Sequence, residues 1–93
     1  MNLMEKPITA NITLNSIEQV NDLCNLCDRY KSKFDVDISC GRYSVDGNSV
    51  LGVLQLFGRT VTVMPLVCEN DDMESVYEFL EGVKMLDDYD EGY

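Results

Sequence analysis

Residues 46–58 decide the fold, and they read Asp46-Gly47-Asn48-Ser49-Val50-Leu51-Gly52-Val53-Leu54-Gln55-Leu56-Phe57-Gly58. The pair Asp46-Gly47 is a turn signal, and either Asn48 or Ser49 can cap a helix by accepting a hydrogen bond from a first-turn N–H. Gly58 can end that helix. The apolar run between them holds more apolar surface than a helix of about three turns can bury on one face. We therefore expect a short helix that turns part of its apolar surface toward a partner.

Length and composition predict one domain. The chain has 93 residues, of which 45% are hydrophobic, enough for a modest core without disulfides. Its apolar runs fall short of the roughly 20 residues that a membrane span needs, and residues 1–10 lack the apolar segment of a signal peptide. We expect a cytoplasmic protein.

The charge is negative and unevenly distributed. The formal net charge is −10; residues 1–59 carry seven acids and six bases, whereas residues 60–93 carry ten acids and one base, Lys84. Phosphate backbones and anionic lipids repel such a chain. Nucleic-acid and membrane-surface roles are therefore disfavoured, and we expect protein or cation partners.

The periodicity of apolar residues predicts an α+β domain with the element order β-α-β-β-α-β-α. Strands are expected at 8–14, 34–40, 42–46 and 59–67, and helices at 16–30, after Ser49, and from the acidic segment 69–72 onward. A right-handed crossover between the first two strands leaves room for the fourth strand between them. All helices then cover one face, and the other meets water. We expect a domain over 8–86, a flexible N-terminus at 1–7 and an acidic disordered tail at 87–93.

Several orientations follow from this pattern. Tyr43 and Val45 are expected to face the core. Pro65 lacks an N–H, so the strand ladder is expected to end, bulge or have a free edge near it. Ser16 with Gln19 forms a capping box at the start of the first helix. The inward stripe of the last helix is expected to comprise Met73, Val76, Tyr77, Leu80 and Val83. Phe79, Met85 and Leu86 are expected to widen that stripe or to cover its edge.

The four cysteines, Cys24, Cys27, Cys40 and Cys68, raise the possibility of a zinc or redox site, because Cys24 and Cys27 have the two-residue ligand gap. The chain has no histidine and no second pair with this gap. Both residues fall on the apolar stripe of the first helix. We expect them to be small buried hydrophobes in a reducing compartment, with no metal and no cofactor.

The segment Asn48-Ser49-Val50-Leu51-Gly52 resembles the regulatory-serine segment of HPr, the phosphocarrier of the bacterial phosphotransferase system, which usually reads Lys-Ser-Ile-Met-Gly. Asp28-Arg29-Tyr30-Lys31-Ser32 is similar to the Asn-Lys-Phe-Lys-Ser at the end of the first HPr helix. The resemblance extends over roughly residues 8–86 and implies the HPr fold, an open-faced β-sandwich.

HPr carries its phosphoryl group on a histidine in the motif Gly-Leu-His-Ala-Arg-Pro. Counting back from Tyr30, Ser16 occupies the histidine position, Glu18 the arginine position and Gln19 the proline position. Transfer between histidines needs a nitrogen nucleophile and a stabilising cation, and both are missing. The resemblance is therefore to a divergent member without the active-site histidine, similar in that respect to the catabolite-repression HPr homologue. We expect no enzymatic activity.

The second HPr feature remains, because Ser49 corresponds to the serine that a dedicated kinase phosphorylates and through which HPr recruits a transcriptional regulator. The resemblance thus implies a regulatory protein-binding module in sugar-uptake control. Its candidate phosphosite is Ser49, and its candidate binding patch is Val50, Leu51 and Leu54. The alternatives are a small-molecule-binding regulatory domain of ferredoxin-like type, which shares the order β-α-β-β-α-β, and a metal or redox protein using Cys24 and Cys27.

Overall fold

The computed structural model describes residues 8–67 and 72–88, so the expected flexible N-terminus at 1–7 lies outside the described residues. Along the chain the elements are β1 (Ala10–Thr13), α1 (Ile17–Tyr30), β2 (Asp35–Cys40), β3 (Tyr43–Asp46), α2 (Val50–Leu54), β4 (Thr60–Leu66) and α3 (Met73–Asp88). The predicted α+β class and element order are confirmed.

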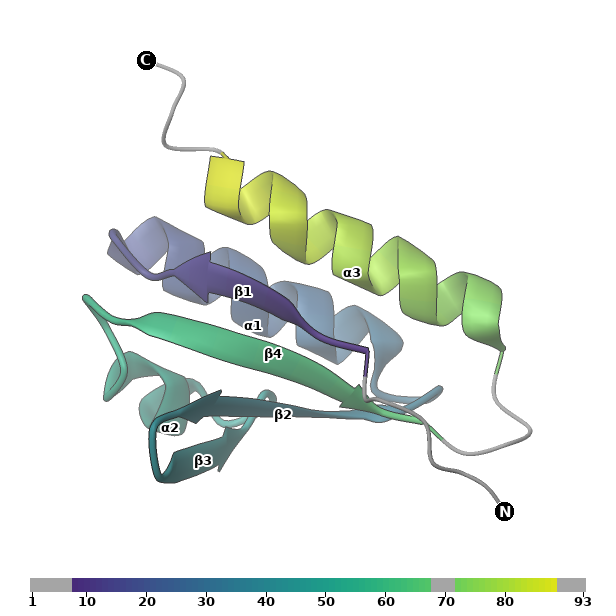
Figure 1. Ribbon diagram of the computed structural model, residues 1–93, viewed down its shortest axis with the longest axis horizontal. Helices are drawn as coiled ribbons and strands as arrows, with labels where there is room; N and C mark the ends of the chain where they lie inside the picture. Colours follow the sequence, from purple (N-terminus) through teal and green to yellow (C-terminus); the bar gives the residue numbers. More distant parts are fainter. Residues whose placement is uncertain (1–7, 68–71, 89–93) are drawn as a thin grey trace.

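The four strands form one antiparallel sheet in the order β1-β4-β2-β3, which places the fourth strand between the first two as predicted. The three helices cover one face of this sheet (Figure 1). Ile12, Val36, Ile38, Val61 and Val63 point toward them and are buried, because every second residue of a strand faces the same side.

Polar rows occupy the opposite face of the sheet. Asn11 lies beside Thr62 and accepts a hydrogen bond from its hydroxyl at 2.9 Å. Thr13 lies beside Thr60, with their hydroxyl oxygens 2.7 Å apart. These side chains form hydrogen bonds with one another instead of packing against a second layer.

Pro65 fits the sheet because its nitrogen, which carries no hydrogen, faces the β1 side of β4 at a point beyond the end of the pairing between β1 and β4. Leu14 donates to the carbonyl of Arg59 at 3.0 Å, and the pairing of β1 with β4 stops at Ala10 and Val63. Hydrogen-bonding groups alternate between the two sides of a strand, so Pro65 shares the β1 side with Arg59 and Val63. The ladder between β4 and β2 therefore continues past it, with Val36 opposite Pro65.

The expected orientation of three apolar side chains was wrong. Tyr43 is 69% exposed, Tyr77 is 55% exposed and Met73 is also exposed. Phe79, which we expected to widen the α3 stripe or cover its edge, is fully buried. It packs edge-on against Tyr30 and Phe34 with ring centroids 5.6 and 5.5 Å away. This aromatic contact rotates α3 so that Tyr77 points to water.

Two element boundaries also differ from expectation. The helix α2 has only five residues, since beyond Leu54 the backbone closes tighter turns: Leu56 and Phe57 donate to carbonyls three residues back. The helix α3 continues through Asp88, so the tail does not begin at Asp87. The carboxylate of Asp87 instead accepts a hydrogen bond from the backbone N–H of Thr13 at 3.0 Å. Residues 89–93 of the expected tail lie outside the described residues.

Replacement of Phe79 tests the rotation of α3. We expect Phe79→Ala to lower the free energy of unfolding by about 3–5 kcal/mol, because it empties the centre of the aromatic group. Tyr77→Ala, two residues away on the exposed side, should change it by less than about 1 kcal/mol. Urea unfolding measures both variants. Equal losses would contradict the rotation.

Candidate functional site

The N-terminus of α1 is held by a complete capping box. The Ser16 hydroxyl accepts a hydrogen bond from the Gln19 backbone N–H at 3.1 Å, and the Gln19 side-chain oxygen accepts from the N–H groups of Asn15 and Ser16 at 2.7 and 3.2 Å. The predicted capping box is confirmed. The hydroxyl of Ser16, the residue that the resemblance places at the histidine position of HPr, is thus part of the helix cap.

Gln19 also connects α1 to α3. Its side-chain nitrogen donates to the carbonyl of Leu86 at 2.9 Å, and the whole residue is buried. A buried amide must satisfy both its donor and its acceptor, and here each has a backbone partner. Glu18, which the resemblance places at the position of the HPr arginine, is exposed. Neither Ser16 nor Glu18 carries a nucleophilic nitrogen or a positive charge.

Ser49 is the N-cap of α2. Its hydroxyl accepts a hydrogen bond from the N–H of Gly52 at 3.2 Å, whereas the backbone N–H of Asn48 donates to the carboxylate of Asp46 at 2.8 Å. Of the two candidate caps that the sequence left open, Ser49 takes the role. Gly52 packs closely against its neighbours, because a Cβ there would lie 3.1 Å from both the Ser49 hydroxyl and the Val45 Cβ.

The candidate patch on α2 is largely exposed. Leu51 is 75% exposed and Val50 is 43% exposed, while Leu54 is half-buried against the core. Phe57, which sequence reasoning left out of the patch, is 44% exposed just beyond the helix. The position of Phe57 in the apolar run could have indicated that it belongs to the patch. In the longer helix that the sequence predicts, however, its side chain would point in a different direction. We call Val50, Leu51, Leu54 and Phe57 the α2 patch.

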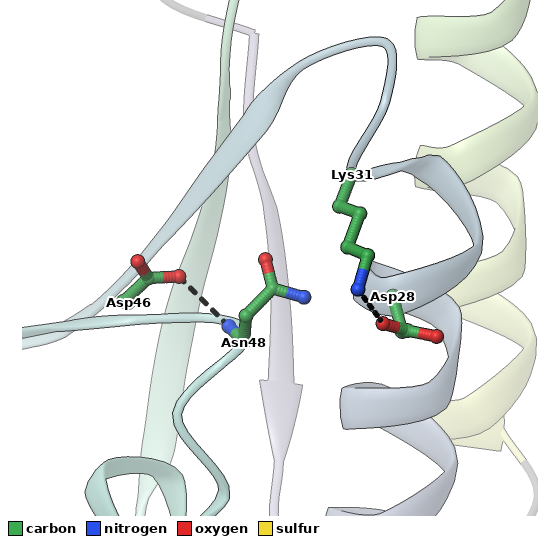
Figure 2. A network of polar contacts seen from close by, with 4 residues as sticks. All are labelled: Asp28, Lys31, Asp46 and Asn48. Atoms are coloured by element: carbon green, nitrogen blue, oxygen red, sulfur yellow. Dashed lines mark hydrogen bonds and ion pairs between the residues drawn. The ribbon is translucent and has the colours of Figure 1, made fainter.

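Ser16 and Ser49 lie near opposite ends of α1. The turn that precedes Ser49 packs on the C-terminal half of α1, since a Cβ on Gly47 would lie 2.7 Å from the Cys27 sulfur. Figure 2 shows Asn48 and Asp46 beside the end of α1, where Lys31 pairs with Asp28 at 2.9 Å. Cys27 is eleven positions from Ser16, which is about 16 Å along a helix. The structure therefore does not bring the two serines into one site.

The far end of α2 does approach the start of α1. The N–H of Gly58 donates to the carbonyl of Leu14 at 2.7 Å, so Phe57 lies beside the loop that leads to Ser16. The C-terminal end of α3 reaches the same end of the molecule (Figure 1). The α2 patch thus extends from the Ser49 cap toward the Ser16 region.

Cys24 and Cys27 are buried on α1, as the interpretation of small hydrophobes predicts. Burial is the main cause that raises the pKa of Cys27 to about 12, with smaller effects from Cys24 and Asp46, and burial also raises the pKa of Cys24. Cys40 is half-buried and free, and Cys68 lies outside the described residues. Over residues 8–67 and 72–88, no three histidine, cysteine or acidic side chains gather as metal ligands.

Two open hollows lie elsewhere on the surface. One, of about 340 Å³, lies between α1 and α3 and is lined by Asp22, Asn25, Leu26, Arg29, Gly82, Met85 and Leu86. The other, of about 200 Å³, is lined by Tyr43, Gln55, Leu56 and Arg59. Within the described part of the chain, no helix is long and apolar enough to cross a membrane.

The order β1-β4-β2-β3 with three helices on one face defines the HPr class of open-faced β-sandwich. HPr-C-His from Thermoanaerobacter tengcongensis superposes with a TM-score of 0.61 at 9% identity, covering 85% of this chain and 93% of that chain. The phosphocarrier protein HPr from Bacillus anthracis str. Ames superposes with a TM-score of 0.57 at 13% identity, covering 85% and 99%. No family model and no curated protein matches the sequence. The predicted HPr-like fold is confirmed, and at this identity the likeness shows the fold alone.

Replacement of Cys27 tests its role as a buried apolar group. We expect Cys27→Ala to destabilise the protein by about 1–3 kcal/mol near pH 7, because it leaves a small cavity. The unfolded thiol ionises near its ordinary value of 9.0, but the folded thiol only near 12. The folded state of the wild type therefore loses stability as the pH rises through this range, and the variant lacks that loss.

The measurement is the difference in unfolding free energy between wild type and Cys27→Ala at several pH values up to 11. The difference should shrink above pH 9. A difference that stays constant with pH, or zinc bound to the wild type and lost in the variant, would contradict the buried-thiol interpretation.

Proposed function

We propose that this chain is a non-catalytic regulatory module of the cytoplasm that has the HPr fold and binds protein partners through the α2 patch. The observation that carries the proposal is the exposure of Leu51, three quarters of whose surface meets water beside the exposed Val50, on a short helix held to the core by Val53. A large apolar side chain exposed in the middle of an apolar cluster is typical of a binding surface.

The chemistry at the start of α1 supports a non-catalytic role. A carrier of the HPr type needs a nitrogen that accepts the phosphoryl group and a cation that stabilises it. This chain has no histidine, and Ser16 uses its hydroxyl as a helix cap. Glu18 adds a negative charge where the phosphoryl anion would form. Binding without phosphoryl transfer fits these residues better.

The composition of the α2 patch supports recognition of an apolar partner surface. Leu51, Val50 and Phe57 supply apolar area, and the exposed polar residues Asn48 and Gln55 lie at its ends. An apolar centre with a polar rim is the usual anatomy of a protein interface. The buried Val53 and Leu56 anchor the short helix, so the patch is presented on a rigid support.

We also propose that phosphorylation of Ser49 controls partner binding at the α2 patch. Ser49 is exposed and immediately precedes Val50 and Leu51. Its oxygen already accepts the N–H of Gly52, an interaction that a phosphate oxygen would strengthen. A charge of nearly −2 at the edge of the patch would change which partners bind there, favouring those with arginine.

Leu51→Asp tests the binding face. We expect this variant to weaken capture of the partner that wild type retains from its own cytosol by at least about tenfold, because a carboxylate replaces the apolar centre. The matched control is Met85→Asp, which alters a residue of similar exposure, 69%, on α3. The control should bind as wild type does.

Quantitative pull-down with the purified partner measures the effect, and circular dichroism checks the fold of both variants. If Leu51→Asp binds as tightly as wild type, or if Met85→Asp loses binding equally, the α2 patch is not the binding face.

Ser49 substitutions separate the capping role from control. Ser49→Ala should lower the free energy of unfolding by about 0.5–2 kcal/mol, because the Gly52 N–H loses its acceptor. Ser49→Asp should be close to neutral, since a carboxylate also caps a helix start. Thermal unfolding measures both.

An HPr-type kinase supplied with ATP should add one phosphate to the wild type and none to Ser49→Ala, and mass spectrometry detects it. The modified protein should bind a partner that the unmodified protein does not. Absence of modification by cognate kinases, together with identical partners for wild type and Ser49→Asp, would leave the capping role alone.

A further inference from the structure

The two edge strands of the sheet differ in what packs against their outer sides. At the β1 edge, α3 packs against the strand and the Asp87 carboxylate accepts the outward N–H of Thr13 at 3.0 Å. At the other edge β3 is the last strand, and in the described part of the chain no strand pairs with its outer side. Unpaired edges are templates for strand pairing, and proteins usually cover them. Among residues 8–67 and 72–88, a helix covers the β1 edge, and no strand pairs with the β3 edge.

The backbone of β3 alternates its hydrogen-bonding groups between β2 and the outer side. The N–H of Gly47 donates to the carbonyl of Val36 at 2.9 Å, which makes Gly47 one of the residues that face β2. Val45 and Tyr43 share that direction, because the alternation has a period of two. The N–H and C=O of Ser44 therefore point outward, and Ser44 is exposed, as are Arg42 and Asp46.

The outer edge is self-complementary in sequence. Residues 42–46 read Arg-Tyr-Ser-Val-Asp. If two copies pair antiparallel about a two-fold axis at Ser44, Arg42 of one lies opposite Asp46 of the partner subunit. Tyr43 then lies opposite the partner's Val45. Opposite charges and an aromatic beside a β-branched residue are favourable cross-strand pairs.

The charges at this edge lack counterions within one chain. Asp46 lies directly opposite Asp37 of β2, so both carboxylates share the open face of the sheet. Like charges in that position are destabilising. Over residues 8–67 and 72–88 the ion pairs are Lys31 with Asp28 and Lys84 with Glu81, so neither Asp46 nor Arg42 takes part in one. A second copy would supply both missing partners.

We propose that the β3 edge pairs with the β3 edge of a second copy of this chain and forms a two-fold dimer. Ser44 exchanges N–H···O=C bonds with the partner's Ser44, and two Arg42–Asp46 ion pairs flank them. The two sheets then continue as one. The contact is small and each chain carries −10, so the dimer should be weak and visible only at high protein concentration. The paired residues include none of the α2 patch, so the dimer does not depend on the proposed function.

Charge reversal tests the pairing. Arg42→Asp places two carboxylates opposite each other at each end of the contact, and Asp46→Arg places two guanidinium groups there. Each variant alone should raise the dimer dissociation constant at least tenfold, whereas an equimolar mixture of the two should dimerise again. Sedimentation equilibrium from 10 µM to about 1 mM, at about 0.15 M salt to screen the net charge, measures this.

A backbone test does not depend on charge. Ser44→Pro removes the outward N–H, a position where an edge strand tolerates proline, and should abolish the dimer. Ser44→Ala is the matched control, because both changes remove the hydroxyl that donates to Asp37 at 2.7 Å, and it should dimerise as wild type does. Unchanged circular dichroism verifies the fold of each variant.

Concentration-dependent dimerisation lost in Arg42→Asp and Ser44→Pro, with recovery in the mixture, supports the pairing. A wild type that stays monomeric at about 1 mM would overturn it, as would a dimer that persists in Ser44→Pro. Recovery is decisive, because a general loss of folding in either variant could not restore association.

Discussion

Only one face of the sheet is apolar and can be buried, and the rest of the structure follows from this constraint. Alternation along the strands places Ile12, Ile38 and Val63 on the same side, so every helix must pack there to bury its own apolar stripe. The opposite face satisfies its polar groups with paired threonine, serine and asparagine side chains. A single core results, with Phe79 of α3 at its aromatic centre.

The same packing gives the start of α1 a structural role. Gln19 bonds the backbone of residues 15 and 16 and the carbonyl of Leu86, which ties the beginning of one helix to the end of another. A buried amide with both groups paired resists movement, because breaking either bond would leave a polar group unsatisfied. The fold is HPr-like, and in it the start of α1 connects two helices.

The two proposed binding surfaces, the α2 patch and the β3 edge, consist of residues that do not form the core. The segment of α2 and the turn after it buries Val53 and Leu56 but leaves Leu51 in water. In the described part of the chain, β3 has no strand on its outer side. Both surfaces lie in the half of the chain where acids and bases nearly balance, whereas the acidic α3 covers β1. Association is therefore favoured where electrostatic repulsion is weakest.

The sequence by itself determined the elements and their order, because alternation, the Ser16–Gln19 capping box and the crossover rule are local or topological signals. It also identified the apolar α2 segment, but not which of Asn48 and Ser49 caps it. Only the tertiary structure decided the rotation of α3 about its axis. Apolar residues lie on more than one side of that helix, so the periodicity of the sequence is compatible with two orientations. The contact of Phe79 with Tyr30 selects one of them. The links from Gln19 to Leu86 and from Thr13 to Asp87 join residues 67 and 74 positions apart, and no local pattern encodes such a distance.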